Sequence, residues 1–358
     1  MTIQMSNNDS FHFTGPSCPI PISEYPYVLM AHGGGGKLTQ QMIRKMFLSQ
    51  FNSELLLPLH DGAMFSIDGT RLAFSTDSYV ISPIFFPGGT IGELAVNGTV
   101  NDLAMCGAAP LYLSAAFIIE EGLAMEDLWK IVVSMQAAAT RAGITLVTGD
   151  TKVVDRGKGD KIFINTSGIG RIPRGIDIHP RRARPGDKIL LSGRIAEHGI
   201  AVMSVREGLQ FQTELTSDCA PLNGLVQEML SVCPDIHVLR DPTRGGVASV
   251  LNEIASEARV GMSIHQDRIP LSEDVRGACE MLGLDPLYVA NEGKLLAFVP
   301  PESAERVLAT MLVHEFGTHA AIIGDVTTDH PGLVTMRTTV GGTRVVDMIS
   351  GEQLPRIC

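Results

Sequence analysis

Stretches of strand length and stretches of helix length alternate along almost the whole chain, and this alternation restricts the fold more than any other feature of the sequence. In the first half, the expected strands are 71–82, 111–120, 144–150 and 161–172, and the expected helices are 91–107 and 125–143. In the second half, the expected strands are 188–191, 262–265, 295–299 and 320–323, and the expected helices are 196–206, 222–231, 244–258 and 302–316. This alternation indicates a fold that mixes helices and strands in both halves of the chain.

A length of 358 residues is long for one hydrophobic core and predicts two domains. The basic stretch "RRARPGDKILLSG", marked by Pro and Gly, leads into a new strand, so we place the boundary within 175–185. The predicted parts are a loosely ordered extension (1–26), an N-terminal domain (27–175), a C-terminal domain (183–339) and a flexible tail (340–358). The segment 341–358, fully extended, would reach at most roughly 60 Å, which is enough to enter a distant cleft.

Composition excludes several classes of protein. Hydrophobic residues make up 44% of the chain and charged residues 19%, which is typical of a globular protein. The net charge of −11 provides no basic surface for nucleic acid or for an acidic membrane. The six cysteines show no C-x-x-C spacing, and the chain shows no secretory signal and no apolar run of membrane-spanning length. We expect a reducing, cytoplasmic protein whose cysteines are free thiols.

A glycine run, "AHGGGGKLT" (31–39), is the first candidate binding element. We expect a short strand at 27–31, the glycine loop, and then an amphipathic helix near Thr39 with Met42, Ile43, Met46 and Phe47 on one face. Backbone N–H groups of such a loop, next to a helix start, suit an anion. The loop is not a P-loop, because Leu38 follows Lys37 where a hydroxyl should hold magnesium. A simple connector is the alternative.

Four carboxylates next to turns or strand ends are candidates for a metal–phosphate site. They are Asp61, Asp77, Asp102 and Asp150, accompanied by Asn97 and Asn101. Magnesium prefers hard oxygen ligands and binds through a few carboxylates together with substrate phosphates. Each acid alone is as well explained as a turn residue or helix cap, so the hypothesis depends on the group.

Three further motifs carry charge. In "GDTKVVDRGKGDK" (149–161), Asp150 and Lys152 lie two apart after a predicted strand, and the lysine could stabilise a transferred phosphoryl group. "RDPTRGG" (240–246) places Arg244 and two glycines at a helix start, which favours an anion. "NEGK" (291–294) puts Glu292 between apolar segments, where a raised pKa would suit a general base. A solvated lysine and an ordinary turn glutamate are the alternatives.

The residues themselves therefore indicate a two-domain magnesium–nucleotide enzyme with a mobile terminal thiol, Cys358, and they do not reveal the substrate. The motifs "AHGGGGKLT", "STDSYVISPIFFPGG", "GTVNDLAMCGA", "FIIEEGL", "TGDTKVV", "DPTRGGV", "NEGK" and the final "PRIC" together resemble the HypE family of hydrogenase maturation proteins. The resemblance runs from about residue 28 to Cys358 and leaves the N-terminal extension unmatched. HypE proteins are in turn similar to the aminoimidazole ribonucleotide synthetase-like (PurM-like) ATP-using enzymes.

The resemblance implies a homodimer whose N-terminal α/β domains pair strands across the two-fold axis into a barrel-like sheet, and a C-terminal α+β domain with a sheet backed by helices. It implies ATP and Mg²⁺ in the cleft between domains. A HypF-type carbamoyltransferase would load a carbamoyl group on Cys358, and ATP-dependent dehydration would turn this S-carboxamide into a thiocyanate. The cyanide would then pass to iron on a HypC–HypD scaffold, for a nickel–iron hydrogenase.

The resemblance also implies roles for individual residues. Cys358 would be the modified carrier, Glu292 the base and Lys152 an electrostatic stabiliser. The metal ligands would be Asp61, Asp77, Asp102 and Asp150. The nucleotide would be bound by Gly33, Gly34, Gly35, Gly36, Lys37, Asn101, Asp102, Gly149, Asp150 and Arg244. Selenophosphate synthetase, the purine enzyme and a non-catalytic scaffold are the alternatives, and the terminal cysteine argues against the first two.

Overall fold

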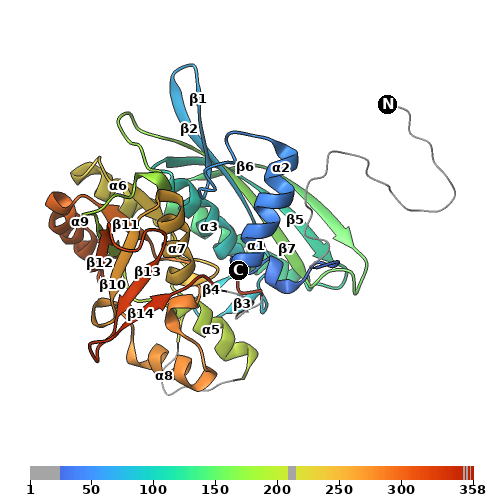
Figure 1. The fold of residues 1–358 in the computed structure, drawn as a ribbon. Coiled ribbons are helices and arrows are strands. Elements are labelled where there is room, and N and C mark those ends of the chain that lie inside the picture. Colours follow the sequence, from blue (N-terminus) through green and yellow to red (C-terminus); the bar gives the residue numbers. More distant parts are fainter. Residues whose placement is uncertain (1–24, 209–214, 350, 352–353, 355) are drawn as a thin grey trace.

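Two β-sheets, one in each half of the chain, hold most of the strands (Figure 1). The computed structural model describes residues 25–208, 215–349, 351, 354 and 356–358. Most of the expected N-terminal extension, residues 1–24, therefore lies outside the described residues. The predicted α/β and α+β architecture is confirmed.

The first sheet has five strands in the order β1-β2-β7-β5-β6. Its strands are β1 (Ala63–Ile67), β2 (Thr70–Tyr79), β5 (Ala109–Glu120), β6 (Thr145–Val154) and β7 (Ile162–Arg171). Strands β5 and β6 are parallel, and the other neighbours are antiparallel. Alternate residues of β7 are buried, because one face of the sheet packs against helix α3 (Ile91–Met105).

Helix α3 forms the core of this half. Thr90 caps it by accepting hydrogen bonds from the backbone N–H groups of Gly92 and Glu93. The helix is buried almost all around, and Tyr79 packs so closely that a Cβ at Gly98 would lie 2.2 Å from its hydroxyl oxygen. Helix α4 (Met125–Ala142) packs on α3 and ends at Gly143 with φ of 69°, as the sequence predicts.

The second sheet has seven strands in the order β14-β13-β10-β12-β8-β11-β9. They are β8 (Lys188–Leu191), β9 (Val238–Arg240), β10 (Gly261–His265), β11 (Leu296–Val299), β12 (Ala321–Thr327), β13 (Val334–Arg337) and β14 (Thr343–Val346). The helices of this half are α5 (Glu197–Arg206), α6 (Asn223–Val232), α7 (Gly246–Ala258), α8 (Glu273–Leu282) and α9 (Pro301–Val313). The four strands predicted in this half are confirmed.

Two sequence expectations are wrong. Residues from 340 onward were expected to lack regular structure, but Thr343–Val346 form β14, which pairs with β13 and buries Val346. A short strand was expected at 27–31, but Met30–His32 form a 3-10 turn, η2. In both short segments the secondary structure depends on contacts with distant parts of the chain and not on local propensity.

The amphipathic helix after the glycine loop is present, as α1 (Lys37–Met42), a π-helical turn η3 (Ile43–Phe47) and α2 (Leu48–Phe51). None of these residues is buried. On its apolar face Met46 and Phe47 are exposed, whereas Met42 and Ile43 are half-buried.

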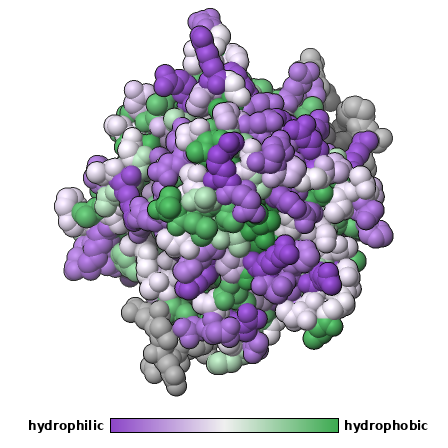
Figure 2. Space-filling model, turned by 90° about the vertical axis from the view of Figure 1, so that its left-hand side faces the viewer, coloured by the Kyte–Doolittle hydropathy of each residue, from purple (hydrophilic) through white to green (hydrophobic). Residues whose placement is uncertain are grey.

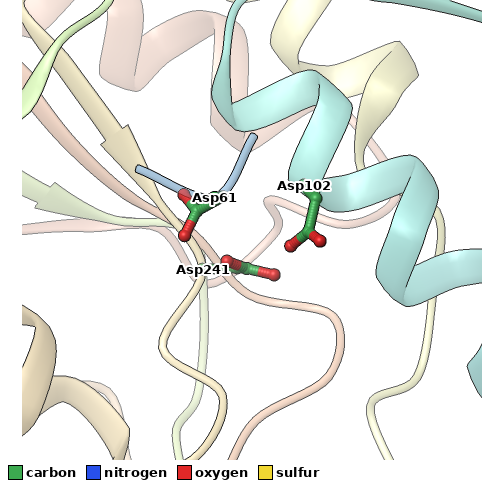
Figure 3. A group of neighbouring side chains, drawn as sticks. All are labelled: Asp61, Asp102 and Asp241. Carbon is green, nitrogen blue, oxygen red and sulfur yellow. The ribbon is translucent and has the colours of Figure 1, made fainter. Parts of the chain in front are cut away.

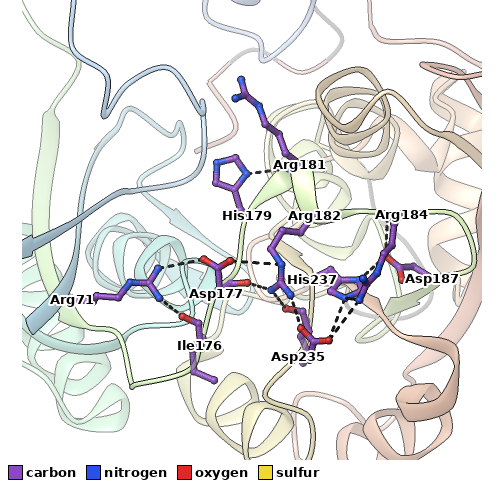
Figure 4. A network of polar contacts seen from close by, with 11 residues as sticks. Arg71, Ile176, Asp177, His179, Arg181, Arg182, Arg184, Asp187, Asp235 and His237 are labelled. Carbon is purple, nitrogen blue, oxygen red and sulfur yellow. Dashed lines mark hydrogen bonds and ion pairs between the residues drawn. The ribbon is translucent and has the colours of Figure 1, made fainter.

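The segment joining the sheets is held by a chain of charged contacts (Figure 4). Arg71 on β2 contacts Asp177 and the carbonyl of Ile176, and Arg182 pairs with Asp235 at 2.5 Å. Farther along, the Nδ1 atom of His237 lies 2.8 Å from Asp187, with both side chains buried. Remaining short elements are β3 (Phe85–Phe86), β4 (Gly89–Thr90), η4 (Pro180–Arg182), η5 (Gln266–Arg268) and η6 (Pro286–Tyr288).

No helix within the described ranges is both long and apolar enough to cross a membrane. On the face toward α6 and α9, apolar patches are interrupted by polar side chains (Figure 2).

Candidate functional site

The end of the chain lies inside the protein, between the two halves. Cys358 is only 9% exposed and Ile357 2% exposed. The backbone N–H of Val80 donates to the main-chain oxygen of Cys358 at 3.1 Å, and that of Ser82 donates to the oxygen of Arg356 at 3.3 Å. The last residues therefore lie along 80–82 much as an added strand would.

Side chains complete the docking of the tail. The Nε atom of Arg356 donates to the oxygen of Val80 at 3.1 Å, and its guanidinium pairs with Asp160. On the opposite side, His198 and Arg206, both on α5, contact the oxygens of Ile357 and Arg356. A cavity of about 280 Å³ remains beside the tail, lined in part by Gly33, Gly34, Arg244, Tyr288 and Cys358.

Three carboxylates converge near this cavity, and Figure 3 shows them facing one another. Asp61 precedes β1, Asp102 lies on α3 and Asp241 follows β9, and one ligand atom from each lies within 4.8 Å of the others. Burial, together with the neighbouring acids, raises the pKa of Asp102 well above its usual range and that of Asp241 to about 8. A cluster of buried carboxylates that oppose one another's ionisation has the donor chemistry of a divalent-cation site.

Arg240 is the cation that the protein itself places at this cluster. Its guanidinium lies 2.9 Å from Asp61 and 2.8 Å from Glu253, and both ion pairs are largely buried. Glu253 also accepts a hydrogen bond from Gln40 on α1 at 2.9 Å. Arg240 therefore links the acid cluster to the helix that follows the glycine loop.

Asp77 and Arg244 lie between the acid cluster and the tail. Their closest charged atoms are 4.0 Å apart, and burial raises the pKa of Asp77 against the opposing effect of Arg244. Burial also raises the pKa of the Cys358 thiol, and Arg244 again opposes the increase. The negative charge that Cys358 can carry is in turn the main cause of a raised pKa of Arg244. Arg244 and the tail cysteine are thus electrostatic neighbours.

Glu292 is 3% exposed, and its pKa is raised well above the usual range, mainly by burial. Within the described residues, no hydrogen-bond donor reaches its Oε1 atom. Its backbone is fixed instead, because its N–H donates to Asp218 at 3.1 Å and Asp218 pairs with the buried Lys294 at 3.0 Å. A buried, held carboxyl with one unused oxygen is suited to exchange a proton with a neighbouring group.

Asn101, on α3, forms hydrogen bonds with the backbone next to the segment that holds Glu292. Its amide nitrogen donates to the oxygen of Ala220 at 3.0 Å, and its amide oxygen accepts from the N–H of Leu222 at 2.7 Å. The structure thus places Asn101 as a link between the two halves, one residue before Asp102.

The glycine loop covers the cavity at close range. A Cβ at Gly35, where φ is +74°, would lie 2.8 Å from the oxygen of Arg244. A Cβ at Gly36 would lie 2.5 Å from the oxygen of Ile349, which also accepts the N–H of Lys37 at 3.1 Å. Only glycine permits this approach, and the side chain of Lys37 pairs with Asp347 at 2.7 Å.

Asp150 and Lys152 are placed differently from the other predicted site residues. They lie within β6 and not after it, together with Gly149, and their exposed side chains pair with each other at 2.7 Å. The structure does not bring Asp150 into the group formed by Asp61, Asp102 and Asp241. Strand β6 is an edge of its sheet, and both of these side chains are exposed there.

Sequence reasoning missed three residues of the site. Asp241 stands in "DPTRGG", the motif from which only Arg244 was chosen, and its position directly after a strand was the available signal. Arg240 begins the same stretch. His198 gave no signal, since a single histidine in an apolar helix is normally a core residue.

Comparison with known proteins finds relatives for both halves of the chain. The AIR synthase related protein N-terminal domain family matches residues 59–172, and the corresponding C-terminal domain family matches residues 184–336. The carbamoyl dehydratase HypE of Azotobacter vinelandii is 54% identical over 331 residues, which are 92% of this chain and 97% of that protein.

Solved structures show the same likeness. The crystal structure of a HypE–HypF complex contains a chain that matches with a TM-score of 0.82 at 50% identity, covering 86% of this chain and 99% of that chain. A hydrogenase maturation protein HypE in complex with ATP matches with a TM-score of 0.79 at 49% identity, covering 93% and 100%. Relatives of this identity span nearly all of the chain, and so it belongs to the HypE family of carbamoyl dehydratases, which act in hydrogenase maturation.

Proposed function

We propose that this protein uses ATP to dehydrate a carbamoyl group carried on its own Cys358, which yields a thiocyanate at that position. The observation that carries the proposal is the docked tail, because it buries Cys358 among Glu292, Arg244 and Asp77. A solved relative has been crystallised with ATP, which supports ATP as the second substrate.

The proposed reaction balances as follows. ATP supplies a phosphoryl group that converts the carboxamide oxygen into a phosphate leaving group. The C–O bond then breaks, two N–H protons are lost, and the C≡N bond forms, so that the products are S-cyanocysteine, ADP and phosphate. Glu292 is placed to accept one of these protons through its unused Oε1, and burial, which raises its pKa, makes the carboxylate a stronger base than an exposed one.

The other residues act on charge. Arg244 beside Cys358 is placed to stabilise negative charge that develops on the carboxamide oxygen. Gly33 and Gly34 line the cavity, and Gly35, Gly36 and Lys37 follow at a helix start, so we assign this loop to the ATP phosphates. Asn101 would orient the ligands around Asp102.

Mg²⁺ fits the acid cluster. Asp61, Asp102 and Asp241 would hold it, with Asp77 close by, and the buried Oδ2 of Asp61 accepts no hydrogen bond from the described residues. Bound there, the ion would neutralise charge on the ATP phosphates. This assignment adds Asp241 to the predicted ligands.

A homodimer is part of the proposal. Large apolar side chains on the sheet and its edges are exposed in the single chain, including Phe74, Tyr112, Ile118 and Val153, and the α1–α2 helix has no buried residue. A second copy meeting β6 would cover such surface and extend the sheet toward the implied barrel. It would also give Gly149, Asp150 and Lys152 a route into the partner's site, where Lys152 would act as stabiliser.

Further partners follow from the reaction. A HypF-type carbamoyltransferase would load Cys358, in line with the solved HypE–HypF complex of a relative, and a HypC–HypD scaffold would receive the cyanide. We place these steps in the cytoplasm, where the free cysteines of the described residues would stay reduced. The division between 27–175 and 183–339 is supported by the end of the first sheet at Arg171 and the start of the second at Lys188, whereas β14 extends the second sheet to Val346.

The test is the mass of the C-terminal peptide after loading by the transferase, before and after Mg-ATP. The expected result is loss of one water from the peptide that ends in Cys358, and no such change in Cys358→Ser. A carbamoyl adduct that Mg-ATP leaves unchanged would reduce the protein to a carrier.

A complementation test addresses the partner's Lys152. Lys152→Ala and Cys358→Ser are both expected to be inactive as homodimers. If Lys152 acts across the interface, mixed dimers regain about half of the sites, because the Lys152→Ala chain keeps its cysteine and meets an intact lysine from its partner. Mixed dimers without activity would show that Lys152 acts within its own chain, and active Lys152→Ala homodimers would show that it has no role.

A further inference from the structure

His198 is fully buried, and both of its ring nitrogens are engaged. It lies in the first turn of α5, with Nε2 2.7 Å from the oxygen of Ile357 and Nδ1 2.8 Å from the hydroxyl of Ser217. A carbonyl oxygen only accepts hydrogen bonds, so Nε2 carries the proton. Nδ1 of the neutral ring then accepts from Ser217, and the Phe86 ring, edge-on at 5.4 Å between centroids, fixes the plane of the imidazole.

Ile357 is the residue directly before the carrier cysteine. Its carbonyl is joined to the Cys358 nitrogen by a planar peptide unit, so a hydrogen bond to that carbonyl fixes the start of Cys358. The contacts of Val80, Ser82 and Arg206 lie on Cys358 and Arg356, on either side of this point. His198 is therefore the side chain that holds the peptide unit from which the reactive cysteine projects.

Ser217 connects this contact to the base. Its hydroxyl oxygen accepts the N–H of Cys219 at 3.1 Å, and its own N–H donates to Pro87 at 2.8 Å. The next residue, Asp218, accepts the N–H of Glu292 at 3.1 Å. One short segment, 217–219, thus holds the imidazole of His198 on one side and the backbone of Glu292 on the other.

We propose that His198 is a positioning residue that aligns the carrier cysteine with Glu292. The segment 217–219 contacts both His198 and the backbone of Glu292, and so it fixes their relative position. The imidazole makes no contact with the reacting atoms. It holds the tail at the depth where the group on Cys358 meets the base, and it slows release of the tail to solvent. The alignment rests on the proposed function, whereas the holding of the tail is independent of it.

Two variants of His198 test the contact. His198→Leu removes the donor to Ile357, and His198→Gln keeps an N–H near the position of Nε2. The first readout is the rate at which iodoacetamide alkylates Cys358 in the otherwise native protein, measured from the mass of the C-terminal peptide. Loss of one buried hydrogen bond should raise the rate roughly five- to tenfold in His198→Leu, and His198→Gln should restore most of the protection.

Two further variants act as a safeguard and a control. Ser217→Ala, which leaves the tail contact itself intact, should raise the alkylation rate by a smaller factor and remains informative if His198→Leu does not fold. His314→Leu removes a histidine that follows α9 and contacts Phe316, and it should alkylate like the wild type. Wild-type alkylation rates in both His198→Leu and Ser217→Ala would overturn the proposal, as would equal rates in the Leu and Gln variants.

The second readout is the single-turnover rate of dehydration of preloaded protein. That rate should fall in His198→Leu while the ATP concentration for half-maximal rate stays unchanged, because the variant alters tail position and not the ATP site. A wild-type protein that never dehydrates its tail, together with faster alkylation of His198→Leu, would overturn the proposed function and leave the holding role standing. Normal dehydration with faster alkylation would overturn the alignment role.

Discussion

Removing the charge of Arg240 should destabilise the protein far more than removing an exposed cation with the same geometry. Arg240 lies 2.9 Å from Asp61 and 2.8 Å from Glu253, and its side chain is 12% exposed. Lys130 on α4 lies 2.8 Å from Glu126, with more than half of each side chain exposed, and serves as the matched control. Both residues are changed to methionine, which keeps an unbranched side chain and removes the charge.

The magnitude follows from burial. At an effective dielectric constant near 20, each pair of Arg240 is worth about 6 kcal/mol before desolvation is subtracted. Removal of one partner from a buried pair costs about 3–5 kcal/mol, because it leaves buried charge without compensation. Protonation of one orphaned carboxylate limits the loss, since it costs about 4 kcal/mol at pH 7 for a group with an ordinary pKa near 4. We therefore expect Arg240→Met to lose about 3–5 kcal/mol, whereas Lys130→Met should leave the free energy of unfolding nearly unchanged because its ion pair is exposed.

The assay is urea unfolding at pH 5, 6.5 and 8, in the presence of a chelator so that no divalent cation replaces the arginine. The loss in Arg240→Met should be largest at pH 8 and shrink toward pH 5, because protons neutralise the orphaned carboxylates. A loss below about 1 kcal/mol that is the same at all three pH values would refute the reasoning, since the pair would then behave like an exposed one.

Three other substitutions test single features. Burial raises the pKa of Glu292, so the stability that its protonated carboxyl contributes is complete below the ordinary carboxylate range and is lost as pH rises. The Tm of Glu292→Gln should therefore exceed that of the wild type by an amount that grows from pH 5 to pH 8. A difference in Tm that stays constant over this range would contradict the prediction. Burial raises the pKa of Asp241 to about 8, so its ionisation also opposes folding as pH rises. Asp241→Asn should therefore raise the Tm of the metal-free protein at pH 8, and it should lose most of any increase in Tm that Mg²⁺ causes in the wild type. An undiminished increase with Mg²⁺ would show that Asp241 is not a metal ligand. Gly35→Ala should lower the free energy of unfolding in urea by about 1–3 kcal/mol more than Gly157→Ala does. Both glycines have positive φ, but only at Gly35 would the new Cβ lie within 3 Å of a backbone oxygen. Equal losses in the two variants would rule out this close contact.

The sequence predicted most strands and helices because their periodicity is strong and their ends are marked. Gly143 ends α4 in the left-handed conformation, as expected from its position. The failures were short segments whose state depends on contacts far along the chain. Strand β14 exists because β13 offers it an edge, and nothing within Thr343–Val346 announces that partner.

The site was predictable where a residue has both a suitable side chain and a telling position next to a turn or a strand end. Asp61 and Asp102 were chosen for their residue type and turn positions, and the structure brings them together with Asp241. The site was not predictable where a residue acts through an edge strand or through a buried contact with a distant part of the chain. Lys152 lies exposed on an edge strand, and the role of His198 depends on a carbonyl 159 positions later in the chain. Such pairings are set by tertiary structure and leave no local pattern.

The docked tail also determines when the protein is vulnerable to chemical damage. Oxidants and alkylating agents attack the thiolate, and burial raises the pKa of Cys358 so that little thiolate forms while the tail is docked. The position in which the carrier cysteine is held for reaction is therefore also a shielded resting state. Irreversible oxidation would therefore require release of the tail from this position. A chain that is slow to be loaded keeps its thiol intact for as long as it waits with the tail inside.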